Sequence, residues 1–133
     1  MTERSYTSLE QSKEVTKFLP LESADMSLSN VSQRGVNYTE AFSPSVVAYT
    51  SISDETKTIS KVWEFYPCWS LGALLKNLPE EIEYEGIKYR LWFSMQDISY
   101  YSVEYEVYLC CTEGEPIDAC IEMYRELKKR NLI

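Results

Sequence analysis

The chain has no histidine and only four glycines among its 133 residues. Without histidine it has no Ser-His-Asp triad, no Cys-His pair and no imidazole general base. The glycine-rich motifs of P-loops and of dinucleotide-binding folds do not occur in the sequence either. No nucleophile–base pair remains to be nominated. We therefore expect a non-enzymatic protein, with no catalytic residue and no cofactor.

Long apolar runs and basic residues are also scarce. No apolar run approaches the roughly 20 residues of a membrane-spanning helix, and residues 1–5 lead into no apolar stretch of the kind found in secretory signals. There are 13 Lys and Arg against 21 Asp and Glu, which gives a net charge of −8. Since no basic stripe is present, we expect no nucleic acid and no membrane among the partners. The acidity suits solubility, or docking onto a basic partner.

Cysteine is present but is not arranged as a metal site. The four cysteines are Cys68, Cys110, Cys111 and Cys120, and none forms a C-x-x-C pair. The neighbours Cys110 and Cys111 point to opposite faces of a strand, so zinc would need all four thiols at unusual spacings. We expect no metal, and buried thiols in a reducing cytosol, with Cys110 on the outer face of the sheet.

The length fits one domain, residues 1–133. An apolar fraction of 44% with 14% aromatic residues argues against disorder. Residues 1–7 are expected to be a loose N-terminus, and residues 27–61 an irregular segment rich in Ser and Thr. Within that segment residues 45–51 are the best strand candidate, residues 36–42 a second one, and residues 54–57 a turn.

The most regular pattern covers residues 87–111, which predict two long antiparallel strands folded back at residues 96–99. Large apolar and aromatic residues occupy the odd positions, with a period of two that is typical of half-buried strands. These odd positions, which we expect to face the core, are Ile87, Tyr89, Leu91, Phe93 and Met95, then Tyr101, Val103, Tyr105, Val107, Leu109 and Cys111. A two-residue loop at Glu85 and Gly86 adds a strand over residues 82–84.

Three helices are predicted, over residues 8–18, 70–78 and 116–130. Ser8 and Gln11 form a capping box for the first helix, and Ser70 is a suitable N-cap for the second. Gly72 lies inside the second helix, where it would allow close packing. The apolar stripes are Leu71, Leu74, Leu75 and Leu78 in the second helix, and Ile117, Cys120, Ile121, Tyr124 and Leu127 in the third. The fold class is therefore α+β, an antiparallel β-meander of three or more strands packed on one face by two to three helices.

The even face of the predicted strands is the candidate binding site. It comprises Lys88, Arg90, Trp92, Glu104, Glu106 and Tyr108, with the two basic residues opposite the two glutamates. Opposite charges across strands stabilise a sheet by roughly 0.2–1 kcal/mol per pair, which by itself explains a solvated face. Trp92 and Tyr100 are large for such a face. It is therefore a platform for a protein or a small ligand, or Trp92 is covered by another part of the chain.

Two further groups of residues have simpler explanations. Trp69, with Trp63, Phe65 and Tyr66, could form a binding surface, but sealing the core is the more common role of aromatic residues. Acidic residues gather at element ends without convergent spacing, as expected of a solvated surface; they are Glu80, Glu81, Glu83 and Glu85, then Glu113, Glu115 and Asp118.

Three stretches of the sequence resemble one family. They are residues 10–13 with 19–26, residues 67–75 with 78–79, and residues 116–120. They look like a family of small uncharacterised proteins encoded by phages and prophages of gut Bacteroidales. The family carries no established activity, so the resemblance implies a setting, a phage accessory protein in the cytoplasm of a bacterial host cell. It implies no mechanism.

Two functional hypotheses follow. The first is a non-enzymatic accessory protein that binds a host or phage protein. The second is a protein that sequesters a small nucleotide signal of host defence, for which Arg34, Arg90 and Trp92 would line a pocket at a homo-oligomer interface. The net charge of −8 argues against the second hypothesis.

Overall fold

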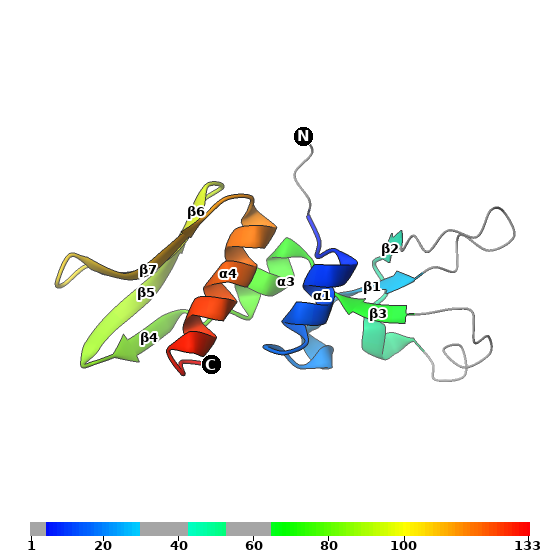
Figure 1. Ribbon diagram of the computed structural model, residues 1–133, viewed down its shortest axis with the longest axis horizontal. Helices are drawn as coiled ribbons and strands as arrows, with labels where there is room; N and C mark the ends of the chain where they lie inside the picture. Colours follow the sequence, from blue (N-terminus) through cyan, green and yellow to red (C-terminus); the bar gives the residue numbers. More distant parts are fainter. Residues whose placement is uncertain (1–4, 30–42, 53–64) are drawn as a thin grey trace, which may run out of the picture. The chain divides into compact units, whose positions relative to one another are not determined.

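The computed structural model describes residues 5–29, 43–52 and 65–133 (Figure 1). The described residues divide into two compact units, one formed by residues 6–29, 43–52 and 65–73, and the other by residues 74–133 with Ser5. The expected elements at residues 36–42 and 54–57, and the residues Arg34 and Trp63, lie outside the described ranges. The expectation of a single domain stays a prediction.

The first unit contains a three-stranded antiparallel sheet with short helices. Its strands are β1 (Met26–Ser29), β2 (Ser43–Ser45) and β3 (Phe65–Cys68), in the order β2-β1-β3. Pro44 lies in β2 and Pro67 in β3, the two outer strands of this three-stranded sheet, and outer strands are where proline is tolerated in sheets. β3 continues through Pro67 to Cys68.

The helix α1 (Leu9–Val15) begins with the predicted capping box. Gln11 N donates to Ser8 Oγ, and Ser8 N donates to Gln11 Oε1. The helix is shorter than predicted, since residues 16–18 form a turn. Thr7, which was expected in a loose N-terminus, is instead buried, and its N–H donates to the carbonyl of Trp69 at 2.9 Å.

The prediction of a strand at residues 45–51 is wrong. β2 ends at Ser45, and Tyr49–Ser51 form a short 3-10 helix, η3. The Ser45 hydroxyl accepts a hydrogen bond from Val47 N, a local turn that competes with strand pairing. Val46 is 86% exposed, so its β-branched side chain has no sheet to pack on.

Trp69 belongs to the core, as predicted. It has no exposed surface, and its indole N–H donates to Ser23 Oγ at 2.9 Å. Ser23 lies in the 3-10 helix η1 (Leu21–Ser23).

The helix α3 (Leu71–Lys76) crosses the boundary between the units, and its N-terminus is capped by Ser70 as predicted, since Ala73 N donates to Ser70 Oγ. Of its predicted leucine face, Leu74 and Leu78 are buried, whereas Leu71 and Leu75 are half-buried.

The second unit is a four-stranded antiparallel meander with a long helix. The strands are β4 (Glu81–Tyr84), β5 (Ile87–Phe93), β6 (Asp97–Ser102) and β7 (Val107–Glu113), in sequence order across the sheet. The helix α4 (Pro116–Lys129) contacts β6 and β7, and Figure 1 shows it along one face of the sheet. The predicted α+β class and the meander are confirmed.

The second long strand of the predicted hairpin is in fact two strands. The hairpin between β5 and β6 turns at residues 94–97, where Ser94 N donates to the carbonyl of Asp97 at 2.8 Å. The chain turns again at residues 103–106, where Ser102 Oγ accepts from Tyr105 N and Glu106 adopts a positive φ of 53°. Side chain to backbone bonds of this kind end a strand locally.

These turns reverse the predicted faces of β6. Phe93 pairs with Ile98 across a four-residue loop, so odd residues of β5 lie opposite even residues of β6. Tyr89 is buried as predicted, but on β6 the residues that join it on the core face are Ile98 and Tyr100. The predicted odd–odd register is therefore wrong, and Tyr100, expected on the outer face, has no exposed surface.

A β-bulge sets the faces of β7. Tyr100 pairs with Cys110 while Tyr101 pairs with Tyr108, so Leu109 is the extra residue. Cys110 consequently lies on the core side, where its thiol contacts the Met123 sulfur at 3.5 Å. The prediction that Cys110 lies on the outer face is wrong, because the exposed thiol is that of Cys111.

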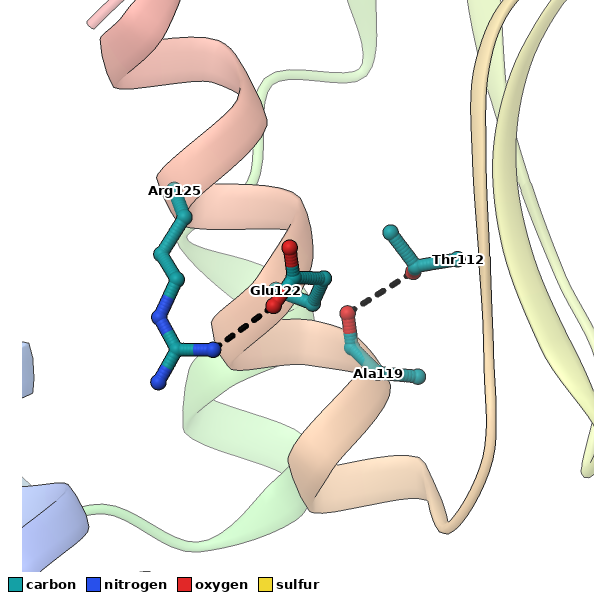
Figure 2. Close-up of polar contacts among 4 residues, drawn as sticks. All are labelled: Thr112, Ala119, Glu122 and Arg125. Atoms are coloured by element: carbon teal, nitrogen blue, oxygen red, sulfur yellow. Dashed lines mark hydrogen bonds and ion pairs between the residues drawn. The ribbon is translucent and has the colours of Figure 1, made fainter.

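The helix α4 packs on the inner face of the sheet with all five predicted stripe residues buried, and Ala119 and Met123 widen that stripe. Thr112 on β7 donates a hydrogen bond from Oγ1 to the carbonyl of Ala119 at 2.8 Å (Figure 2). On the exposed side of the helix Arg125 pairs with Glu122 at 2.6 Å. Burial raises the pKa of both Tyr100 and Tyr124, whose hydroxyls donate to the carbonyls of Pro79 and Leu74.

Candidate functional site

The outer face of the four-stranded sheet holds Lys88, Arg90 and Trp92, and all three are exposed. The partners of the two basic residues differ from the prediction. Lys88 lies opposite Glu83, and Arg90 lies opposite Glu81 on the neighbouring strand β4. Opposite charges in these cross-strand positions attract each other and lower the net charge of this part of the face.

Glu104 and Glu106, the predicted partners, lie in the turn at residues 103–106 and are exposed. They belong to no strand, so the structure does not bring them beside Lys88 and Arg90. The predicted pairing required one continuous strand opposite β5, and the turn at residues 103–106 interrupts that strand.

Aromatic side chains dominate the outer face beyond the charged pairs. Trp92 is 53% exposed and Tyr108 is 64% exposed. Tyr101 pairs with Arg90 on one side and with Tyr108 on the other. The rings of Tyr101 and Tyr108 have centroids 4.6 Å apart and are tilted by 49°. The pair of tyrosines and the indole of Trp92 thus project from three adjacent strands, β5, β6 and β7.

These side chains surround a hollow with a volume of about 440 Å³, which we call the aromatic hollow. Its lining residues are Trp92, Phe93, Ser94, Asp97, Ser99, Tyr101 and Tyr108. Ser99 pairs with Trp92 on β5 and with Cys111 on β7. It is only 6% exposed although it points outward, so the larger side chains around it cover it.

Two carboxylates lie at one end of the hollow. Asp97 on β6 pairs directly with Glu113 on β7, and Ser94 Oγ donates to Asp97 Oδ1 at 2.8 Å. Cys111 is the neighbour of both on this face. Partial desolvation, followed by the negative charges of Asp97 and Glu113, raises the pKa of the Cys111 thiol. The two carboxylates therefore concentrate negative potential beside the aromatic rings.

Sequence reasoning identified Trp92 and Tyr108 but missed Tyr101, Ser99 and Asp97. Asp97 was interpreted as a turn residue, whereas it begins β6. Tyr101 was placed on the core face because its odd number matched that of Tyr89. The four residues between Phe93 and Ile98 reverse this parity, and the polar residues Ser94, Gln96 and Asp97 were the signal for a loop there.

The structure gives no support to the buried thiols or the acidic residues as reactive or metal-binding groups. Burial raises the pKa of the Cys68 thiol and raises that of Cys120 to about 12, so both thiols stay protonated and unreactive near neutral pH. Among the residues that the structure describes, no group of three or more Cys, Asp or Glu is placed to hold a metal ion. The acidic residues Glu80, Glu81, Glu83, Glu85, Glu113 and Asp118 are exposed, and Glu115 is half-buried.

Comparison with known proteins finds no relative. No protein-family model, no curated protein and no solved structure matches this chain. Within the described ranges, the helices are too short or too polar to cross a membrane.

Proposed function

We propose that this chain is a non-enzymatic protein-binding module that docks a host or phage protein on the outer face of its four-stranded sheet. The observation that carries the proposal is the exposed aromatic surface around the hollow. Trp92 and Tyr108 are each more than half exposed, and together with Tyr101 they line one hollow. Large aromatic residues gathered at the surface are typical of protein interfaces.

The surroundings of these aromatic residues support the same function. The fully buried centre of an interface is aromatic and depleted of charge, with a polar rim around it. The hollow has this arrangement, since the Arg90–Glu81 and Lys88–Glu83 pairs lie on one side of it and Asp97 with Glu113 on the other. The predicted residues Lys88 and Arg90 thus become rim residues, and Trp92 and Tyr108 become central ones.

The composition of the hollow also favours binding over catalysis. Its ionisable side chains are Asp97, Tyr101 and Tyr108. The Ser94 hydroxyl donates to Asp97 within the turn between β5 and β6, a local bond that holds the turn, and the sequence contains no imidazole that could act as a stronger general base. Recognition requires only shape, aromatic surface and charge, all of which the hollow provides.

Sequestration of a small molecule is the second candidate, favoured by one observation. The volume of about 440 Å³ falls within the range of small-molecule sites, roughly 300–1,000 Å³. A nucleotide signal fits less well, because Asp97 and Glu113 would repel its phosphates and Arg90 lies opposite Glu81. A protein partner therefore remains the better proposal. The phage setting rests on the sequence resemblance alone.

The experiment that tests the proposal compares two exposed aromatic residues. Trp92 lines the hollow, whereas Tyr105 is 56% exposed in the turn at residues 103–106 and does not line it. Tagged wild-type protein, Trp92→Ala and Tyr105→Ala are used to capture proteins from lysate of the native host, followed by quantitative mass spectrometry. We expect a protein recovered by the wild type and by Tyr105→Ala but lost with Trp92→Ala.

Thermal unfolding of all three proteins provides the control for folding. Since Trp92 is more than half exposed, Trp92→Ala is expected to keep most of the stability. A captured protein that binds all three variants equally would contradict docking at this face. Turnover of a substrate by the purified protein would contradict the non-enzymatic role.

A further inference from the structure

We infer that the aromatic hollow binds a cationic side chain, an arginine carried by a basic segment of the partner protein. The inference rests on the proposed function and names the chemistry of its partner. It is carried by the combination of aromatic rings and paired carboxylates on one exposed face. Neither feature alone would specify a ligand.

The aromatic rings supply the first part of the recognition. The faces of tryptophan and tyrosine rings attract cations within about 6 Å of their centroids, and most strongly when the site is desolvated. Trp92, Tyr101 and Tyr108 lie on three adjacent strands around one hollow. A flat guanidinium group stacks on such rings better than the compact ammonium of lysine does, and it keeps its charge at every physiological pH.

The carboxylates supply the second part. Asp97 and Glu113 are directly paired across β6 and β7. Like charges in such a pair destabilise a sheet. The residues next to them on this face are Ser94, Ser99 and Cys111, which are uncharged near neutral pH. A bound cation would offset this repulsion, which favours binding of a positive charge at this end of the face.

The remaining charges of the face agree with this choice. On the outer face of the sheet the register places two basic residues, Lys88 and Arg90, and four acidic ones, Glu81, Glu83, Asp97 and Glu113. The two basic residues lie opposite Glu83 and Glu81, which leaves Asp97 and Glu113 as the excess. The whole chain has a charge of −8, so it attracts a basic partner at long range as well.

The test uses three blocked pentapeptides and the full-length chain labelled with ¹⁵N. The peptides are acetyl-Gly-Gly-X-Gly-Gly-amide, in which X is arginine, citrulline or norleucine. Citrulline keeps the shape of arginine without the charge, and norleucine is apolar. We expect the arginine peptide to shift the amide resonances of Ser99 and Cys111 saturably, with affinity about tenfold higher than that of citrulline, which corresponds to about 1.4 kcal/mol.

Variants separate the two parts of the site. Trp92→Ala is expected to weaken the arginine peptide about tenfold, while Trp92→Phe, which keeps an aromatic face, retains most of the affinity. Asp97→Asn is expected to weaken the peptide about threefold and to reduce the dependence of binding on salt. Tyr105→Ala, outside the hollow, leaves binding unchanged. Well-dispersed spectra of each variant show that it is folded.

The exposed thiol of Cys111 gives an independent readout. It lies beside Ser99 on the outer face, whereas Cys110 lies on the core side. We expect the arginine peptide, but not the citrulline peptide, to slow the alkylation of Cys111 by a maleimide. Digestion and mass spectrometry assign the modified thiol.

Several results would overturn the inference. Equal binding of norleucine and arginine would show an apolar pocket, and binding of the arginine peptide by Trp92→Ala at full affinity would show a purely electrostatic contact elsewhere. Self-association of the chain that Trp92→Ala abolishes, measured by sedimentation, would show that a second copy occupies the hollow. If the lysate partner depends on Trp92 while no arginine peptide binds, the proposed function stands and this inference fails.

Discussion

Tyr101 on β6 and Tyr108 on β7 face each other across the outer side of the sheet, with ring centroids 4.6 Å apart. The bulge at Leu109 is what brings them together. If the same sequence paired in a regular register without a bulge, the pair of Tyr100 with Cys110 would be followed by a pair between Tyr101 and Leu109. The bulge therefore places an aromatic ring where a leucine would otherwise stand, and so completes the aromatic hollow.

Deleting Leu109 should be tolerated for this reason. The deletion makes Tyr108 and Cys110 consecutive and leaves the pairs Tyr101–Tyr108 and Tyr100–Cys110 in one regular register. We expect a cost of less than about 2 kcal/mol in the free energy of unfolding, because no residue changes face. Urea denaturation followed by circular dichroism measures it. Deletion of Leu91 in the middle of β5, which reverses the faces of half a strand, is the control and should prevent folding.

A substitution in the loop between β4 and β5 should increase the stability of the protein. Glu85 and Gly86 have φ values of 51° and 81°, as a two-residue hairpin turn with left-handed residues requires. Asparagine adopts this conformation more easily than glutamate, so Glu85→Asn should raise the free energy of unfolding by about 0.5–1 kcal/mol. Gly86→Ala should lower it by about 1 kcal/mol or more. A midpoint that moves the same way for both variants in chemical denaturation would contradict the assignment of this turn.

Gly72 should be replaceable by alanine with a gain in stability. The sequence suggested that glycine here permits close packing, but a Cβ at this position would meet, among the described residues, only the hydroxyl of Ser70 at 3.7 Å. This is ordinary contact, so the higher helix propensity of alanine should raise the free energy of unfolding by about 1 kcal/mol. Thermal denaturation measures the change. A loss of stability would show that another part of the protein does approach Gly72 closely.

The hydrogen bond from Thr112 to the carbonyl of Ala119 ties β7 to α4 (Figure 2). Thr112→Val keeps the shape but removes the donor, and should cost about 1 kcal/mol in the free energy of unfolding. The exposed pair Arg125–Glu122 on the same helix is the matched control. Its loss in Arg125→Ala should change stability by less than about 0.5 kcal/mol. Equal effects of the two variants in urea denaturation would refute this ranking.

The stability of the protein should fall as the pH rises above 9. Burial raises the pKa of the Cys120 thiol from 9.0 to about 12. Between these values the unfolded chain releases the proton that the folded chain keeps, so deprotonation favours unfolding. Tyr100 and Tyr124, whose pKa values burial also raises, act in the same direction above pH 10. Unfolding curves measured between pH 8 and pH 11 should therefore give a free energy of unfolding that decreases with rising pH. The decrease should be less steep in Cys120→Ala.

Local patterns in the sequence were sufficient for the helices and for the first two strands of the meander. Ser8 with Gln11, and Pro116 at the first turn of α4, are signals that act over three or four residues, and the structure confirms both. The stripe from Ile117 to Leu127 specified a buried helix face in the same way. The alternation around Tyr89 correctly identified the inner and outer faces of β5.

The candidate site could be predicted only in part. Trp92 stood out as an aromatic residue on a polar face, and the structure leaves it exposed there. The neighbours of Trp92 depend on which residues of β6 and β7 lie opposite β5. The sequence alternation continues through residues 101–111 as if the strand were unbroken, so it gives no sign of the turn at residues 103–106. Glu104 and Glu106 were consequently assigned to a face that they do not join.

The sequence was sufficient to predict the α+β class, the three helices and the loop at Glu85 and Gly86, and it marked Trp92 as a large residue on a polar face. It could do so because capping, helical periodicity and strand alternation are local properties of the chain. The register of β6 and the bulge at Leu109 became evident only in the tertiary structure. These depend on the length of one loop and on the packing of Ile98 and Tyr100 under α4, contacts that no local pattern contains. The aromatic hollow depends on both that register and that bulge.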